Sequence, residues 1–145
     1  MPLYPDRARS RVPRTTHVPD VVAGLVHDGM ASLVALAAVR EAVSRGSRVR
    51  FLQVLPVGLS EEDHAGVEAA LFGIAIKALH AQPRVPCTFE SVVGTPATTL
   101  VEQSRQAGLL VVGHDPPESH GRPGVAVAEY CQEHCECEVL VVTTA

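Results

Sequence analysis

The segment Val111–Cys131 has the layout of a phosphate-binding loop: an apolar strand that ends in a glycine, a polar loop, and then a helix. Such loops hold anions because glycines let the backbone approach phosphate oxygens and because the first N–H groups of the helix face the anion. Gly113, Arg122 and Gly124, with those first N–H groups, are the candidates for holding phosphates. Pro116 argues against this chemistry, since proline has no backbone N–H. Two interpretations follow: a nucleotide-binding loop, or a loop that has lost this function.

Three cysteines and a histidine lie close together near the C-terminus, at Cys131, His134, Cys135 and Cys137. Thiolates and imidazole rings bind zinc, and a thiol of lowered pKa senses oxidants. The spacing C-x3-C-x-C matches no strong zinc signature, and Cys131 and Cys135, one helical turn apart, would equally face the core. We therefore predict no metal site, and the role of the three cysteines stays open.

His114, Asp115, Ser119 and His120 are residue types found in hydrolytic sites. Nothing in the sequence orients them toward one another, and there is no strand-to-helix elbow that would present a nucleophile. Two adjacent prolines between them predict a fixed turn. We therefore predict no catalytic residue and no enzyme, with weak ATP hydrolysis as the one alternative left open.

Composition limits the classes of function. The chain has 145 residues, enough for one domain with a full core, and its 46% hydrophobic and 19% charged residues are typical of a soluble globular protein. A net charge of −4 and only 3% aromatic residues argue against nucleic acid as a partner. The sequence shows no membrane span and no secretion signal, so we expect a cytoplasmic protein with free thiols.

The N-terminal residues 1–19 are rich in proline and arginine and predict a flexible arm. A basic hook for an anionic partner is the alternative interpretation of this arm. Residues 20–145 form the single domain.

Within that domain, apolar runs alternate with helical patterns. The runs predict five strands, at Asp20–Val26, Arg48–Val57, Arg84–Gly94, Leu109–Gly113 and Glu138–Thr143. The segments between them predict four helices, at Met30–Arg45, from Ser60 past Ala78, from Thr95 to Gly108, and over Gly124–Cys135. The first helix carries Leu36, Val39 and Val43 on one apolar face, and the second has an expected buried stripe at Val67, Leu71, Ile74 and Ala78.

This alternation predicts an α/β fold with a parallel sheet and right-handed crossovers. Ligands of such folds bind at the carboxyl ends of the strands, where the direction of winding reverses. The loops after the first and fourth strands are therefore the expected place for a site.

Three segments at these positions resemble universal stress proteins, over about Val21–Thr143. They are "HDGMASLVALAAVREAVSRGSRVRFLQVLP", "VVGTPATTLVEQSRQAGLLVVG" and "VAEYCQEHCECEVLVV". The resemblance implies a single-domain, flavodoxin-like three-layer sandwich with five parallel strands in the order 3-2-1-4-5.

Members of this family that bind ATP carry Gly-x2-Gly-x9-Gly-(Ser/Thr) after the fourth strand. Gly113 matches the first glycine, but the second falls on Pro116, and the final pair falls on Val125 and Ala126. Gly124 lies one residue early, where a shifted loop would partly compensate. The resemblance thus implies ATP as a possible ligand, and these departures make ATP binding doubtful.

The family's ATP binders also have an acidic residue that contacts the base at the end of the first strand. Asp28 is the nearest match, although it needs a one-residue insertion, without which the position falls on Val26. Val54, late in the second strand, is apolar as an adenine-contacting wall would be, like any strand residue of a core.

The last strand is short and rich in β-branched residues, and in this family it commonly pairs between subunits. The resemblance therefore implies a homodimer through Val139, Leu140, Val141 and Val142. An edge shielded by the N-terminal arm is the alternative.

Together these observations predict a cytoplasmic, dimeric interaction or ligand-sensing module of the universal stress type, without catalysis and without a required cofactor. Its partner would be an unknown protein or small ligand. The alternative is a nucleotide-binding switch with slow ATP hydrolysis. A flavin or electron-transfer module is disfavoured, because few aromatic residues are available to flank a flavin.

Overall fold

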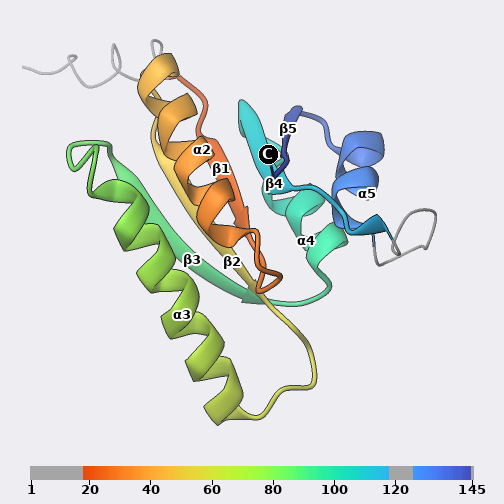
Figure 1. The fold of residues 1–145 in the computed structure, drawn as a ribbon. Helices are drawn as coiled ribbons and strands as arrows, with labels where there is room; N and C mark the ends of the chain where they lie inside the picture. Colours follow the sequence, from red (N-terminus) through yellow and green to blue (C-terminus); the bar gives the residue numbers. More distant parts are fainter. Residues whose placement is uncertain (1–17, 118–125, 145) are drawn as a thin grey trace, which may run out of the picture.

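The computed structural model describes residues 18–117 and 126–144. The predicted arm therefore lies outside the described residues, apart from its last two. Strands and helices alternate along the chain (Figure 1). The elements are β1 (Val21–Leu25), α2 (Ala31–Arg45), β2 (Val49–Leu55), α3 (Glu61–Leu79), β3 (Cys87–Val93), α4 (Pro96–Gln103), β4 (Leu109–Gly113), α5 (Val127–His134) and β5 (Glu138–Val142).

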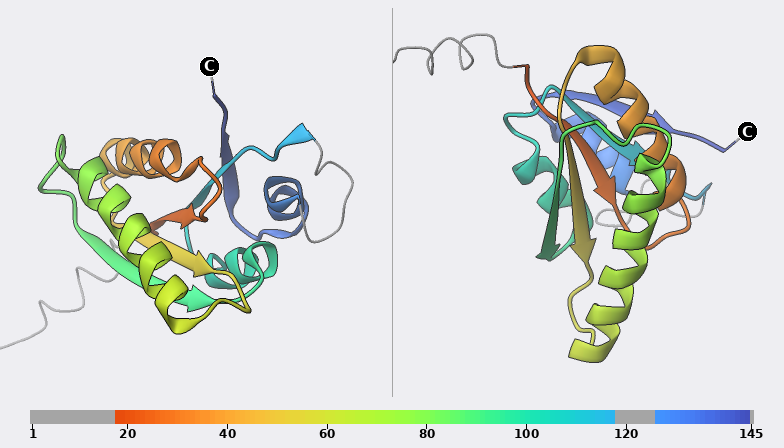
Figure 2. Two further views of the ribbon diagram at one scale, coloured as in Figure 1. Left: turned by 60° about the horizontal axis from the view of Figure 1, so that its bottom comes forward. Right: turned by 90° about the vertical axis from the view of Figure 1, so that its left-hand side faces the viewer.

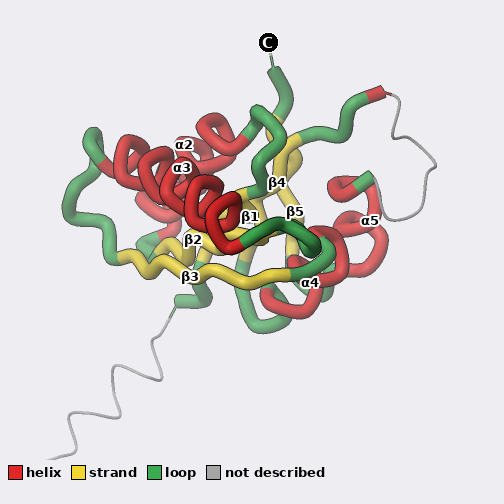
Figure 3. Tube along the Cα trace, turned by 90° about the horizontal axis from the view of Figure 1, so that it is seen from below, coloured by secondary structure: helices red, strands yellow, loops and turns green. Residues whose placement is uncertain are grey.

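The strands form one parallel sheet in the order β3-β2-β1-β4-β5, as predicted. The central strand β1 pairs with β2 and with β4, so that Val21 lies beside both Val49 and Leu109. Helices α2 and α3 cover one face, and α4 and α5 cover the other (Figures 2 and 3). The result is a three-layer sandwich in which β3 and β5 are the edges.

Side chains of β1 alternate between two core clusters, one on each face of the sheet. Val21, Ala23 and Leu25 belong to the cluster under α2 and α3, whereas Val22 belongs to the cluster under α4 and α5. Successive side chains of a strand point to opposite faces, and both faces are covered here. All five residues of β1 are accordingly buried, as a continuous apolar run predicts.

The start of α3 confirms one local prediction. Ser60 is the N-cap, and its hydroxyl accepts a hydrogen bond from the backbone N–H of Asp63 at 3.1 Å. Leu71 and Ala78 of the expected stripe are buried, while Val67 and Ile74 are half-buried.

The face expected for the first helix is wrong for two of its three residues. Leu36 is 42% exposed and Val43 is 48% exposed, and only Val39 is buried. The face against the sheet is built mainly of small residues, at Ala31, Val34, Ala35, Ala38, Val39 and Ala42. Alanines let the helix approach the strands closely, so the larger leucine and valine side chains are left on its outer surface.

The third helix ends at Gln103 rather than at Gly108, which corrects the predicted boundary. Arg50 donates a hydrogen bond to the carbonyl oxygen of Gln103 at 3.0 Å, and the N–H of Gly108 donates to the backbone carbonyl oxygen of Asp20 at 2.8 Å. These bonds turn the chain back toward the start of β1 before another helical turn forms. The predicted first residues of the fourth helix, Gly124 and Val125, lie outside the described residues.

Within the parts of the chain that the structure describes, no helix has both the length and the apolar character needed to cross a membrane.

Candidate functional site

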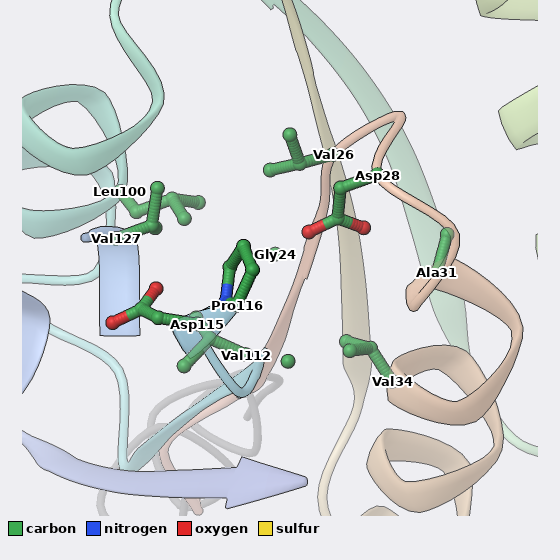
Figure 4. Close-up of a pocket in the computed structure, with 11 residues that line it drawn as sticks. Gly24, Val26, Asp28, Ala31, Val34, Leu100, Val112, Asp115, Pro116 and Val127 are labelled. Carbon is green, nitrogen blue, oxygen red and sulfur yellow. The ribbon is translucent and has the colours of Figure 1, made fainter. Parts of the chain in front are cut away.

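The candidate site is a cavity of about 200 Å³ at the carboxyl ends of β1 and β4 (Figure 4). After β1 the chain passes to α2 on one face of the sheet, and after β4 it passes to α5 on the other. This is the reversal point at which open α/β sheets bind ligands, so the site lies where the sequence predicts it. Its apolar walls come from Val26, Ala31, Val34, Leu100, Val112 and Val127.

Asp28 lies on the α2 side of the cavity, between Val26 and Ala31 (Figure 4). Its Oδ1 accepts a hydrogen bond from the backbone N–H of Met30 at 2.9 Å, which fixes the turn that leads into α2. Gly29 takes a φ of 88°, a left-handed conformation that favours glycine. No hydrogen bond joins the other oxygen, Oδ2, to another described residue, and Asp28 lines the cavity.

Asp115 lies on the opposite side of the cavity and binds the start of α5. Its Oδ1 accepts from the N–H of Ala128 and its Oδ2 accepts from the N–H of Glu129, both at 2.9 Å. The N-cap residue itself, Ala126, makes no side-chain capping bond. Asp115 therefore supplies from thirteen residues away the acceptor that α5 lacks locally.

This contact limits the expectation that the first N–H groups of the last helix are available to an anion; those of Gly124 and Val125, where that helix is predicted to begin, lie outside the described residues. Two N–H groups of the helix, at Ala128 and Glu129, already donate to the Asp115 carboxylate. The negative charge also lies at the positive end of the helix dipole, where a phosphate would otherwise be stabilised. From the sequence, Asp115 was considered only as part of a hydrolytic group, so this role was missed.

Gly113, the candidate first glycine of the loop, ends β4 and lines the cavity. A Cβ atom at this position would lie only 2.6 Å from the Cβ of Met30. Glycine is therefore required for Met30, at the start of α2, to pack against the end of β4. This packing explains the glycine without a phosphate.

Of the remaining predicted nucleotide-binding residues, the two that the structure describes do not line the cavity. Val54 is fully buried in the core cluster under α4 and α5 and does not line the cavity, because β2 is separated from β4 by β1. Ala126 is buried at the start of α5 and is also absent from the lining. Arg122, Gly124 and Val125 lie outside the described residues.

The cysteines pack around the C-terminal end of α5. Cys131 is fully buried, and burial, reinforced by the neighbouring Cys135, raises its pKa to about 12. The Sγ of Cys135 lies 3.6 Å from the Oγ of Ser104. Burial also raises the pKa of Cys137. The thiols of Cys131 and Cys137 are therefore protonated at neutral pH, which fits the core-packing interpretation.

The ring contact and the hydrogen bond of His134 are with Tyr130 and not with the cysteines. Its ring stacks on Tyr130 with the centroids 4.1 Å apart, and its Nδ1 is bonded to the carbonyl oxygen of Tyr130 at 3.0 Å. Among the described residues, no group of three or more histidine, cysteine or acidic side chains is arranged to hold a metal ion.

The last strand, β5, pairs with β4 along one side and forms an edge of the sheet. Leu140 and Val142 pack against the cluster under α2 and α3, and Val139 and Val141 pack against the cluster under α4 and α5. The side chains predicted for a dimer interface thus belong partly to the core, and the backbone of the other side of β5 has no strand partner in the described part of the chain.

The fold recurs in solved universal stress proteins. One in complex with cAMP has 20% sequence identity, and the match covers 90% of this chain and 100% of that chain with a TM-score of 0.70. A universal stress protein from Archaeoglobus fulgidus in complex with dAMP has 21% identity, with 86% and 97% covered and a TM-score of 0.60. A family protein from Arabidopsis thaliana with AMP bound has 16% identity, with 88% and 92% covered and a TM-score of 0.59.

No protein-family model matches the sequence, and no curated protein matches it. The structural likenesses nevertheless cover most of the chain, and they confirm the predicted flavodoxin-like architecture and the resemblance to a UspA-like domain at the level of the fold.

Proposed function

We propose that this chain is a ligand-sensing module of the universal stress type, which binds an adenine-type ligand in the cavity between β1 and β4 and catalyses no reaction. The observation that carries the proposal is the position of the cavity, at the reversal point of a fold whose solved examples include complexes with AMP, dAMP and cAMP. At about 200 Å³ the cavity is smaller than the roughly 300–1,000 Å³ of drug-sized pockets and suits a base better than a whole nucleotide.

The bonding of the polar groups around the cavity supports a role in binding rather than catalysis. Both oxygens of Asp115 are bonded to backbone N–H groups. His114 makes its ring contact with the backbone carbonyl of Asp115, at 3.1 Å, and not with the carboxylate. A general base needs a geometry directed at a reacting proton, and these two side chains are directed at the backbone instead.

We further propose that the module works as a homodimer through β5. An unpaired strand edge is a template for pairing with a second chain, and a symmetric pair of such edges closes the assembly. Light scattering coupled to size exclusion tests this directly, since a monomer at all concentrations would contradict it. The expected cytoplasmic location remains a prediction.

Ligand binding is tested by isothermal titration calorimetry with adenosine, AMP, dAMP and cAMP. We expect saturable binding of at least one of them. Val26→Phe, which places a larger side chain in the cavity wall, should abolish it. Val57→Phe is the matched control, because Val57 is 70% exposed in the loop after β2 and lies away from the cavity. Failure of every ligand to bind would contradict the proposed function.

A nucleotide-binding switch that hydrolyses ATP slowly remains the alternative. It predicts that affinity rises with the number of phosphates and that purified protein releases phosphate from ATP.

A further inference from the structure

We propose that the cavity accepts an uncharged adenine base or nucleoside and excludes its phosphorylated forms, with Asp115 as the residue that determines this specificity. The inference rests on the proposed function, because it names the chemical class of ligand for the same cavity. Asp115 would act as a built-in anion, in the position at the start of α5 that a phosphate would need.

The first supporting feature is the bonding of Asp115. Its carboxylate spans two successive N–H groups, those of Ala128 and Glu129, with both bonds at 2.9 Å. A phosphate at the start of α5 would have to displace this carboxylate or approach it closely as a second negative charge. Either alternative is unfavourable, because like charges that meet in a partly desolvated site repel strongly.

The second supporting feature is the charge of the surroundings. The described residues that line the cavity include the carboxylates of Asp28 and Asp115 but no lysine, arginine or histidine. The described loops that follow the strands, at residues 26–30, 56–60, 94–95, 114–117 and 143–144, contain two histidines, His27 and His114, but no lysine or arginine. The first turn of α3, at the same end of the sheet, adds Glu61, Glu62 and Asp63. The field of these described residues therefore disfavours anions; Arg122, also in the loop after β4, lies outside them.

The third supporting feature is the combination of apolar walls and a hydrogen-bond acceptor in the cavity. Its walls are apolar, and Oδ2 of Asp28 lacks a partner among the described residues, so it accepts hydrogen bonds. A flat base with an exocyclic amino group matches both features, since its ring packs on apolar side chains and its N–H donates to the carboxylate. A neutral ribose adds no charge, whereas each phosphate adds at least one.

The experiment compares adenosine, AMP and ATP by calorimetry with the full chain. We expect adenosine to bind at least about tenfold more tightly than AMP, and ATP to bind more weakly still, as like-charge repulsion predicts. Because salt screens repulsion, the difference between adenosine and AMP should shrink between about 20 mM and about 500 mM ionic strength. AMP binding as tightly as adenosine, or more tightly, would overturn the inference and leave the proposed function intact.

Asp115→Asn tests the assigned residue. Asparagine keeps one oxygen that accepts from the start of α5 but removes the negative charge. We expect the ratio of the AMP affinity to the adenosine affinity to rise about tenfold. Glu136→Gln is the matched control, because it removes one exposed negative charge at the opposite end of the sheet, where Glu136 pairs with Arg105; it should leave the ratio unchanged.

Asp28→Asn separates the two carboxylates. It should weaken adenosine binding, since a carboxylate accepts hydrogen bonds more strongly than an amide.

An unchanged ratio of the AMP affinity to the adenosine affinity in Asp115→Asn would show that Asp115 does not set the specificity. If that variant fails to fold, as judged by its circular dichroism spectrum, the salt dependence of the wild-type protein still decides the proposal.

Discussion

The two ends of the parallel sheet use carboxylates in opposite ways. At the amino ends of the strands and in the middle of β3, carboxylates of described residues pair with arginines. The pairs are Asp20 with Arg48 at 2.9 Å, Glu90 with Arg50 at 2.8 Å, Glu138 with Arg45 at 3.2 Å and Glu136 with Arg105 at 3.4 Å. At the carboxyl ends, the hydrogen bonds of Asp28 and Asp115 to other described residues all come from backbone N–H groups. Among the described residues, the first end is neutralised by arginine side chains, whereas the second has two carboxylates beside a cavity and no arginine paired with them.

This difference separates two uses of carboxylates: those paired with arginines stabilise the fold, and those beside the cavity can also affect a ligand. An arginine partner neutralises a carboxylate, so such a pair has little effect on ligands beyond its immediate surroundings. A carboxylate that caps a helix stabilises the helix through the helix dipole, but its negative charge still acts on any ligand nearby. The comparison therefore predicts that substitutions at the carboxyl ends affect packing, helix caps and ligand choice, whereas those at the amino ends affect the dependence of stability on pH.

The largest effect is expected for Gly113→Ala, at the carboxyl end of β4. The added Cβ would lie 2.6 Å from the Cβ of Met30, so the start of α2 must move. Overpacking of this kind costs about 2–3 kcal/mol in free energy of unfolding, measured by urea denaturation. Gly73→Ala is the control, because Gly73 lies within α3 and a Cβ added there would meet no neighbouring atom within 4 Å; it should gain about 0.5–1 kcal/mol. Equal stability of Gly113→Ala and the wild-type protein would show that the close packing of Met30 against Gly113 does not limit the residue at this position.

The second effect concerns Asp115→Ala. Removal of the carboxylate leaves the N–H groups of Ala128 and Glu129 without their acceptor, and the loss of a helix cap costs up to about 2 kcal/mol. Urea denaturation gives the size of the loss, and hydrogen exchange of the α5 amides gives its place. Protection should fall at the start of α5 and stay unchanged in α3. A uniform loss of protection over both helices would contradict a local cap.

The caps of α3 and α5 also show how far the sequence predicts the structure. Ser60 lies directly before α3, so its role depends on neighbouring residues and is visible in the sequence. Asp115 acts across thirteen residues, and its role depends on the start of α5 lying beside the end of β4, which no local pattern specifies. One indirect signal exists: Ala126, the residue at the cap position of α5, has no side chain that accepts a hydrogen bond.

The same distinction, between local patterns and contacts across the fold, explains which other predictions the structure confirms and which it corrects. The order of strands and helices follows from local hydrophobic patterns, and the position of the cavity follows from that order. The outward direction of Leu36 and Val43 depends instead on how closely α2 approaches the sheet, which is set by its alanines.

The third prediction tests the amino end through Glu90→Gln. Two hydrogen bonds from Arg50, at 2.8 and 2.9 Å, hold the pKa of Glu90 below its usual value. Because the pair is partly exposed, we expect its loss to cost about 1 kcal/mol at pH 7.

The pH dependence gives a sharper test of this pair. A pKa that is lower in the folded than in the unfolded chain gives stability that is complete above the unfolded pKa of about 4.3 and is lost as the pH falls through the lower folded value. The urea midpoint of the wild-type protein should therefore approach that of Glu90→Gln between about pH 5 and pH 3. Parallel curves for the two proteins over this range would contradict the assignment.

The smallest effect is expected for Asp28→Ala, and it separates the two carboxylates of the cavity. Asp28 makes one local hydrogen bond, to the N–H of Met30, whereas Asp115 makes two that join distant segments. Its removal should therefore cost only about 0.5 kcal/mol of stability, at the low end for a helix-capping residue. Adenosine titration of the same variant should nevertheless show weaker binding, because a carboxylate that lines the cavity is lost. A large loss of stability with unchanged binding would reverse the roles assigned to Asp28 and Asp115, since Asp28 would then be the structural carboxylate of this end.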